Sequence, residues 1–323
     1  MKSALAMNEF ELIDQFFKPI FAKRNDVLFG IGDDAACVRL SPGKNILIST
    51  DTLVSSVHFL PEWEPFDIAY RAAMVNISDM AAMAADPCWV TLAITLPELN
   101  QSWLESFSRG LESALSEYNV ALIGGDTTRG PLSITITVMG TAPDGQAIRR
   151  NGAKPGDVIL VSGVLGAAAL AVQLLTQNDL PQHDKEELKS KLLHPKPRVD
   201  LAPILRSYAS SAIDISDGLS ADLNHICVAS GVGACLTESL IPVHGLLNKY
   251  LPGQAVDLAL TGGDDYELCF TVPAESLDAV MRTLDKANLT CYPIGVIEEQ
   301  RGLRIKLADN TYEQLKPRGY SHF

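Results

Sequence analysis

Apolar side chains recur at helical spacing in three stretches of the first half of the chain. An N-terminal helix capped by Asn8 and Glu11 would gather five apolar residues on one face: Phe10, Ile13, Phe16, Phe17 and Ile20. Residues 66–85 and 101–118 show the same period, and Pro87 ends the first of these two runs. We therefore expect three helices in this part of the chain.

Short apolar runs between these helices predict strands. Residues 36–40 and 45–50 flank a turn at 41–44 that contains Pro and Gly, which predicts a β-hairpin. Three further strands are expected at 89–96, 120–123 and 133–141. Strands interleaved with helices make the first half an α+β unit.

A turn-rich stretch predicts a domain boundary near the middle of the chain. Residues 144–145 and 152–157 are rich in Gly, Pro and Asp, and 323 residues suit two domains. We place an N-terminal domain at 1–148 and a C-terminal domain at 149–323. Beyond the boundary, helices and strands alternate, beginning with a strand at 157–162 and helices at 165–175 and 182–193.

Composition indicates a globular, soluble protein. Hydrophobic residues make up 47% of the chain and charged residues 20%, without the run of about 20 apolar residues that a membrane-spanning helix needs. The apolar start of the chain is too short for a signal peptide, which predicts a cytoplasmic location. The six cysteines are scattered and mostly have apolar neighbours, so we expect buried thiols and no zinc ribbon or disulfide scaffold.

The net charge of −13, from 39 acidic and 26 basic residues, makes nucleic acid an unfavourable partner. The same field repels ATP. If the substrates are phosphates, cations must therefore lie between them and the protein.

The carboxylates gather in six short motifs with Gly, Ser or Thr. These motifs are G-I-G-D-D (30–34), S-T-D (49–51), N-I-S-D (76–79), G-G-D-T-T-R-G (124–130), D-I-S-D-G (214–218) and G-G-D-D-Y-E (262–267). Glycine lets the backbone approach a ligand closely, and aspartate supplies the hard oxygen ligands that suit Mg²⁺. Any one motif is better explained by a turn or an N-cap. Six in one chain, at expected ends of strands, favour one shared metal–phosphate site.

Other common catalytic designs leave no trace in the sequence. The histidines lack zinc-site spacing, and there is no P-loop, protein-kinase signature or G-x-S-x-G elbow. What remains is phosphoryl transfer in which several Mg²⁺ ions bridge protein carboxylates and substrate phosphates. The basic residues best placed for phosphate are Arg129, Arg149, Arg150 and Lys154, although each alone is better explained as a surface charge.

These motifs together resemble the thiamine-monophosphate kinase family. The resemblance covers about residues 9–323 in the family's order and includes the terminal G-Y-S-H-F. It implies the two-domain fold of the aminoimidazole ribonucleotide synthetase superfamily, of α+β class. The N-terminal domain, with a mixed sheet, would bind ATP and Mg²⁺ and form a homodimer. The α/β C-terminal domain would complete the active site.

The resemblance also implies roles for individual residues. Magnesium ligands would be Asp34, Ser49, Thr50, Asp51, Asp79, Asp126, Asp214 and Asp217, several of them through water. ATP would contact Gly125, Asp126, Arg150 and Ser216, and thiamine monophosphate would contact His58, Asp264 and Tyr320. Asp264 departs from the family, which usually has Glu there, one methylene longer.

The implied reaction is ATP-dependent phosphorylation of thiamine monophosphate to thiamine diphosphate. A phosphate monoester is already ionised near pH 7, so the reaction needs no catalytic base, and we expect none. An aminoimidazole ribonucleotide synthetase-like enzyme stays open because a fold does not fix a substrate. A non-catalytic divalent-ion or nucleotide sensor stays open as well.

Overall fold

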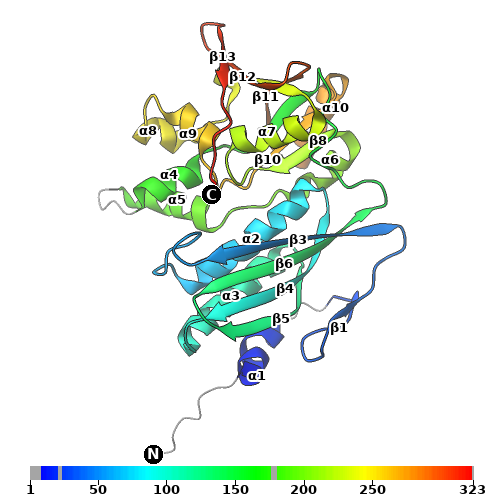
Figure 1. Ribbon diagram of the computed structural model, residues 1–323, viewed down its shortest axis with the longest axis vertical. Helices are drawn as coiled ribbons and strands as arrows, with labels where there is room; N and C mark the ends of the chain where they lie inside the picture. Colours follow the sequence, from blue (N-terminus) through cyan, green and yellow to red (C-terminus); the bar gives the residue numbers. More distant parts are fainter. Residues whose placement is uncertain (1–8, 21–23, 176–179, 322–323) are drawn as a thin grey trace, which may run out of the picture. The chain divides into compact units, whose positions relative to one another are not determined.

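The computed structural model describes residues 9–20, 24–175 and 180–321, which divide into two units (Figure 1). Unit 1 comprises Met1–Met80 and Asp86–Gly145, and unit 2 comprises Ala81–Ala85 and Gln146–Phe323. Residues 81–85, at the end of α2 (Pro65–Ala82) and just before β4 (Asp86–Leu96), thus belong to the second unit. The described helices include none that is both long enough and apolar enough to cross a membrane.

Unit 1 contains a mixed four-stranded sheet. Its strand order is β3-β6-β4-β5, with antiparallel pairs except for the parallel pair β4–β5. The strands are β3 (Lys44–Val54), β4 (Asp86–Leu96), β5 (Ala121–Arg129) and β6 (Ser133–Pro143). β3 and β5 are therefore the two outer strands.

Two long helices cover one face of this sheet (Figure 1). They are α2 (Pro65–Ala82) and α3 (Gln101–Glu117), close to the two helices expected from the apolar period. Asn100 begins α3 by accepting a hydrogen bond from the Trp103 amide at 3.1 Å. Alternate β6 residues point into the helices, and Ile134, Ile136 and Val138 are at most 1% exposed. Because side chains alternate along a strand, the sheet has one face that packs on the helices and an opposite face that does not.

We call that opposite side the open face. On β3 it carries Ile46, Ile48, Thr50, Thr52 and Val54, of which Ile48 is 61% exposed. The register places Thr137 of β6 beside Thr50, and Thr135 beside Thr52. Their hydroxyl groups form hydrogen bonds of 2.9 and 2.8 Å, so polar pairs cross a partly apolar surface.

The N-terminal segment is helical from residue 9 to 20, as predicted. It begins as α1 (Glu9–Leu12) and continues as a π-helix, η1 (Ile13–Phe17), and a 3₁₀ turn, η2 (Lys18–Ile20). Phe16 and Phe17 are buried, whereas the side chains of Phe10 and Ile20 lie outside the described residues.

The hairpin predicted between residues 36–40 and 45–50 is wrong. β2 (Cys37–Val38) pairs with β1 (Val27–Phe29), and β3 pairs along its whole length with β6. The turn at 41–44 exists, but Val38 packs against the cluster around Trp89 while β3 continues into the larger sheet. Long pairing with β6 therefore prevails over local pairing across the turn.

Unit 2 contains a seven-stranded mixed sheet of order β13-β12-β9-β11-β7-β10-β8. Among its described strands, β9 and β12 form the only parallel pair of neighbours. The strands are β7 (Val158–Ser162), β8 (Ser211–Asp214), β9 (Gly233–Thr237), β10 (Leu268–Val272), β11 (Cys291–Glu298), β12 (Gly302–Lys306) and β13 (Tyr312–Leu315). Strand β7 confirms the strand expected at 157–162.

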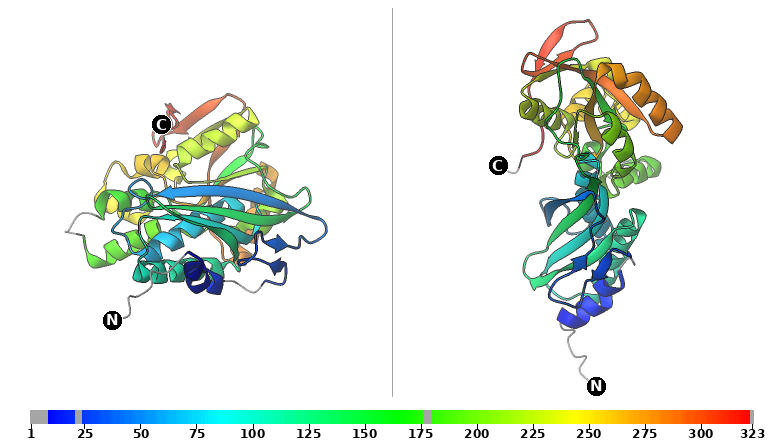
Figure 2. Two further views of the ribbon diagram at one scale, coloured as in Figure 1. Left: turned by 60° about the horizontal axis from the view of Figure 1, so that its bottom comes forward. Right: turned by 90° about the vertical axis from the view of Figure 1, so that its right-hand side faces the viewer.

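Helices lie on both faces of this sheet; α7 (Leu219–Ser230) and α10 (Leu277–Ala287) lie on opposite sides (Figure 2). The other helices are α4 (Ala167–Leu174), α5 (Gln182–Leu193), α6 (Ala202–Tyr208), α8 (Gly245–Tyr250) and α9 (Ala255–Thr261). Short 3₁₀ turns lie at η3 (Val199–Leu201), η4 (Glu238–Leu240) and η5 (Ala274–Ser276). Helices α4 and α5 confirm the two expected after the boundary.

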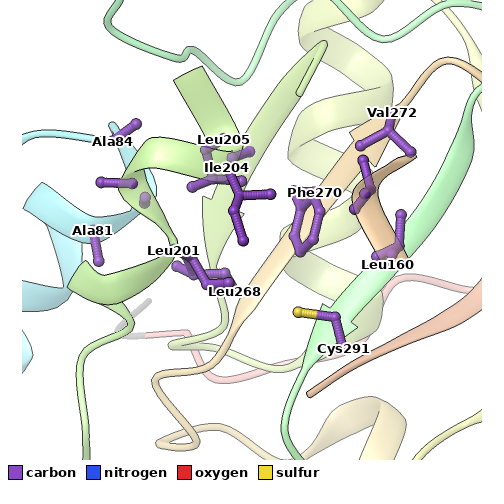
Figure 3. Close-up of a cluster of buried hydrophobic side chains, with 14 of the residues drawn as sticks. Ala81, Ala84, Leu160, Leu201, Ile204, Leu205, Leu268, Phe270, Val272 and Cys291 are labelled. Carbon is purple, nitrogen blue, oxygen red and sulfur yellow. The ribbon is translucent and has the colours of Figure 1, made fainter. Parts of the chain in front are cut away.

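Alternate residues of β10 fill the core under α6 and α10. Leu268, Phe270 and Val272 are fully buried and pack with Leu160 and Leu205 (Figure 3). Burial of each such side chain contributes about 1.5–3 kcal/mol. The adjacent residues Cys269 and Thr271 are also fully buried, so helices cover both faces of this strand.

Candidate functional site

A hydroxyl and two carboxylates meet where β3 passes α2. Ser49 donates a hydrogen bond of 2.5 Å to Asp79, and the Asp51 amide donates one of 3.2 Å to the Asn76 side chain. Burial, together with the charge of Asp79, raises the pKa of Asp51 to about 6. A cation bound beside these two carboxylates would relieve their repulsion.

Thr50 and Asp126 lie apart from this group. Thr50 points to the open face, because neighbouring residues of a strand point to opposite faces. Asp126 lies on β5, at the other edge of the same sheet, where it pairs with Ala93 of β4. Unit 1 therefore brings Ser49, Asp51 and Asp79 together but separates them from Asp126.

A cavity of about 590 Å³ lies beside β5 in unit 1. Its walls include residues 30–36 and 122–127, so Asp34, Gly125 and Asp126 share one concave surface. A Cβ atom on Gly125 would lie 1.8 Å from the Leu92 carbonyl oxygen, so only glycine fits at this position. Asp14 and Phe17 of the first helix also line the cavity, and the sequence carried no signal for this.

The segment that carries Gly30–Asp34 is held at its base by a second group that the sequence analysis missed. The Arg24 guanidinium donates to both oxygens of Asp26, at 2.9 and 2.6 Å, and holds the pKa of that carboxyl below its usual value. The Trp89 indole donates to Asp26 at 3.2 Å. Val27, Ala36 and Val38 pack on the apolar cluster around Trp89. We call Arg24, Asp26 and Trp89 the anchor.

His58 lies in the turn that follows β3. Its Nδ1 accepts a hydrogen bond of 3.0 Å from the Val54 amide. In the neutral ring the proton is therefore on Nε2, which can donate to a phosphate oxygen.

Three segments of unit 2 that carry candidate residues are joined by backbone hydrogen bonds. The Asp264 amide donates to the Ser216 carbonyl at 2.8 Å, and the Tyr320 amide donates to the Asp217 carbonyl at 3.1 Å. A Cβ atom on Gly263 would lie 2.5 Å from the Ser216 oxygen. Asp214, the last residue of β8, leads directly into this turn. Unit 2 thus brings Asp214, Ser216, Asp217, Asp264 and Tyr320 together.

A buried carboxylate holds the turn between β8 and α7. Asp222 is 2% exposed, and one of its oxygens accepts hydrogen bonds of 3.1 Å from the amides of Asp217 and Gly218. Burial and the charge of Asp217 raise the pKa of Asp222 to about 7, against the opposing charge of Arg150. Arg150 is therefore near the same turn.

Two further carboxylates hold the segment that contains Asp264. Asp265 accepts a hydrogen bond of 2.8 Å from the Gly166 amide at the start of α4, and burial of its carboxyl group raises its pKa to about 8. Glu267, 5% exposed, binds Arg198 through both oxygens and accepts a 2.6 Å hydrogen bond from Ser162. The sequence showed both acids in a motif but gave no sign of these structural partners.

The donor set fits magnesium better than a metal held by protein alone. Across the described ranges, no three His, Cys, Asp or Glu side chains are grouped closely enough to hold a metal ion. Magnesium characteristically binds one or two carboxylates and completes its coordination with water and substrate phosphates. The pair Asp51 and Asp79, in which the charge of Asp79 helps to raise the pKa of Asp51, is a suitable donor set of this kind.

Sequence and structure comparisons agree on one family. The family model for the N-terminal domain of AIR synthase related protein matches residues 32–142 of this chain. The model for the C-terminal domain of that family matches residues 154–308. Thiamine-monophosphate kinase of Escherichia coli K12 is 45% identical over 99% of both chains. The crystal structure of thiamine-monophosphate kinase from Stenotrophomonas maltophilia K279a has a TM-score of 0.86 at 44% identity, covering 93% of this chain and 96% of that one.

A third relative was solved with ligands. The complex of AaThiL with AMPPCP and TMP has a TM-score of 0.79 and 31% identity, and covers 98% of this chain and 97% of that one. The match to the Escherichia coli enzyme extends over both units. The chain therefore belongs to the thiamine-monophosphate kinase family and has its two-domain AIR synthase related fold.

Proposed function

We propose that this protein transfers the γ-phosphoryl group of ATP to thiamine monophosphate, giving thiamine diphosphate and ADP. The observation that carries the proposal is the similarity over 98% of the chain to AaThiL, a relative solved with AMPPCP and TMP. The aspartate and glycine residues gathered in each unit supply the chemistry that such a reaction needs.

Positioning explains how these residues perform the transfer. The attacking phosphate oxygen is ionised near pH 7, so no side chain has to remove a proton. The barrier lies in bringing two phosphate groups together in line, and it falls when both are oriented and their charge is offset. We accordingly assign no catalytic acid or base.

ATP is held by Gly125, Asp126, Arg150 and Ser216. The missing side chain of Gly125 leaves room for a phosphate close to the backbone. Arg150, exposed in unit 2, can engage phosphate oxygens through two N–H groups. His58, Asp264 and Tyr320 contact thiamine monophosphate, where the Nε2 proton of His58 would donate to a phosphate oxygen.

Several magnesium ions are expected. They would be held by Asp34, Ser49, Thr50, Asp51, Asp79, Asp126, Asp214 and Asp217, several of these residues acting through water. When bound, magnesium offsets the negative charge of the phosphates and helps to orient them. The protein's part is to present hard oxygen donors in the fixed positions described above.

A homodimer through unit 1 completes the site. With strands about 4.8 Å apart, β3 and β5 of one sheet are separated by about 14 Å. Magnesium binds its ligands at about 2.1 Å, so Thr50 and Asp126 of one chain do not reach the same ion. A second copy packed on the open face, with its β5 beside β3 of the first copy, would place its own Asp126 near Thr50 of the first copy. The 61% exposure of Ile48 supports contact at this face.

The domain roles and location follow from the same account. Residues 1–148 bind ATP and magnesium and form the dimer, and residues 149–323 complete the active site. The location is cytoplasmic, which agrees with the free thiols of all six cysteines.

Coupled measurement of ADP release tests the activity. With ATP and excess magnesium, ADP should form only when thiamine monophosphate is present. Release that instead requires an aminoimidazole ribonucleotide precursor would favour a synthetase, and tight ATP binding without release would favour a sensor. Either result would overturn the proposal.

A further inference from the structure

Asp222 occupies a central place in the turn that leads from β8 into α7. Its side chain is buried within unit 2, and one carboxylate oxygen accepts the amide protons of both Asp217 and Gly218. The Asp222 amide in turn donates to the Gly218 carbonyl at 3.0 Å and begins the hydrogen bonding of α7. Because Asp222 lies beneath the turn, it does not compete with a ligand for the outer surface.

The backbone of Gly218 explains why the turn needs such support. Gly218 has φ 128°, and a Cβ atom there would lie 2.9 Å from the carbonyl group of Thr261. The turn therefore passes close to the end of α9 in a conformation that glycine alone adopts readily. Glycine leaves the unfolded chain free to move, so side-chain hydrogen bonds must select this one conformation.

The turn also carries the two other segments of the site. The Ser216 carbonyl accepts from Asp264, and the Asp217 carbonyl accepts from Tyr320. Gly319 allows this last approach, because a Cβ atom on it would lie 2.6 Å from the Asp217 oxygen. A shift of the Asp217 peptide would move a metal ligand and both of these segments at once.

We propose that Asp222 is a positioning residue that aligns Asp217, Asp264 and Tyr320 by binding the Asp217 and Gly218 amides. This role rests on the proposed function, which assigns those three residues to magnesium and thiamine monophosphate. It concerns a side chain that touches neither ligand. The carboxylate acts as a hydrogen-bond acceptor, so an amide oxygen at the same position should replace it.

Three variants test the role. Asp222→Ala removes the acceptor, and Asp222→Asn retains it on an isosteric side chain. Asp184→Ala is the matched control, since Asp184 is another carboxylate of unit 2, 5% exposed, that accepts from two donors, Lys249 and Tyr250. Hydrogen exchange of the Asp217 and Gly218 amides, without ligand, is the direct readout. Steady-state kinetics with each substrate are the second.

Loss of two hydrogen bonds corresponds to about a tenfold effect. Asp222→Ala should speed exchange of the two amides about tenfold and raise the KM for thiamine monophosphate by a similar factor. Asp222→Asn should stay within about threefold of the wild type in both. Asp184→Ala should lower the melting temperature and leave both readouts unchanged.

Unchanged exchange in Asp222→Ala would overturn the proposal. So would an Asn variant as impaired as the Ala variant, which would assign the effect to charge, or a loss of stability alone. Because exchange is measured without substrate, it remains informative even if the wild type fails to phosphorylate thiamine monophosphate. Failure of the positioning role and failure of the proposed function are thereby distinguished.

Discussion

Asp264 occupies a backbone conformation that most side chains avoid. Its φ is 70°, and Tyr266, two residues later, has φ 49°. Asp and Asn tolerate this left-handed region better than most residues do. The thiamine-monophosphate kinase family usually has Glu at this position. Asp therefore favours the turn locally and shortens the side chain by one methylene.

Substitutions at Asp264 separate its charge from its role in the turn. If the carboxylate contacts thiamine monophosphate, Asp264→Ala and Asp264→Asn should raise the KM for that substrate by about 5- to 150-fold. The KM for ATP should stay within about twofold, and Asp264→Glu should keep most activity. Steady-state kinetics against both substrates check this. If Asp264→Asn left both KM values unchanged, Asp264 would not be a contact of thiamine monophosphate.

Asp265 makes stability depend on pH. Its pKa is about 8 in the folded protein, against about 3.9 when unfolded, so the folded state binds the extra proton between these values. The contribution is fully present below pH 3.9 and is lost as the pH rises toward 8. The slope from this group is at most about 1.4 kcal/mol per pH unit.

We therefore expect wild-type stability to fall between pH 6 and 8 relative to Asp265→Asn, which keeps an acceptor for the Gly166 amide. Urea unfolding at several pH values measures the difference. Parallel pH profiles for the two proteins would show that the carboxyl group does not take up a proton on folding.

The anchor couples a short hairpin to the cavity. β1 and β2 form a two-stranded sheet, which is marginally stable by itself. Arg24, Asp26 and Trp89 fix its base against β4, and the Gly30–Asp34 segment that it carries lines the cavity. The position of Asp34 therefore depends on residues several positions away from any acidic motif.

Removal of the anchor should weaken the nucleotide side of the site. We expect Asp26→Ala to raise the KM for ATP and the half-saturating free Mg²⁺ at least about fivefold, because an ion pair and an indole hydrogen bond are lost. The KM for thiamine monophosphate should change less than about twofold. Asp144→Ala, which loses only an exposed contact with Asn45, serves as the control. Equal changes in both KM values would contradict the assignment.

The apolar periodicity of the sequence predicted some helices and strands correctly and others incorrectly. The helix at 101–118 was foreseen because one side of it is continuously apolar, and α3 confirms it. The hairpin at 36–50 was not, because its strands gain more from Trp89 and β6 than from each other. The motifs at 49–51 and 124–126 were expected at strand ends but lie inside β3 and β5. Their Gly and Asp residues therefore do not mark a strand end.

The candidate site was predictable as a list of residues but not as an arrangement. Ser49 and Thr50 are adjacent in sequence, yet strand geometry sends them to opposite faces. Glu267 stood inside a recognised motif and Asp222 four residues beyond one, but the sequence did not show the hydrogen bonds that their side chains form. A single sequence shows which residue types each motif contains. It does not show which side chains become partners once the chain has folded.

Across the molecule, the separation of β3 and β5 predicts a site shared between two chains. Thr50→Val should lower kcat about tenfold and Asp126→Asn at least about 10²-fold as homodimers. In a heterodimer of the two variants, one shared site carries both substitutions and the other carries neither. Differently tagged heterodimers should therefore recover about half of the wild-type activity. An inactive heterodimer would place each complete site within one chain.

The identity of the phosphorylated product tests the central claim most directly. Phosphorus NMR of the protein with ATP, thiamine monophosphate and excess Mg²⁺ follows every phosphate in the mixture. The account predicts that the thiamine monophosphate resonance is replaced by the two coupled resonances of thiamine diphosphate, in equal amount to the ADP formed. Formation of ADP with inorganic phosphate and unchanged thiamine monophosphate, or no consumption of ATP, would contradict it.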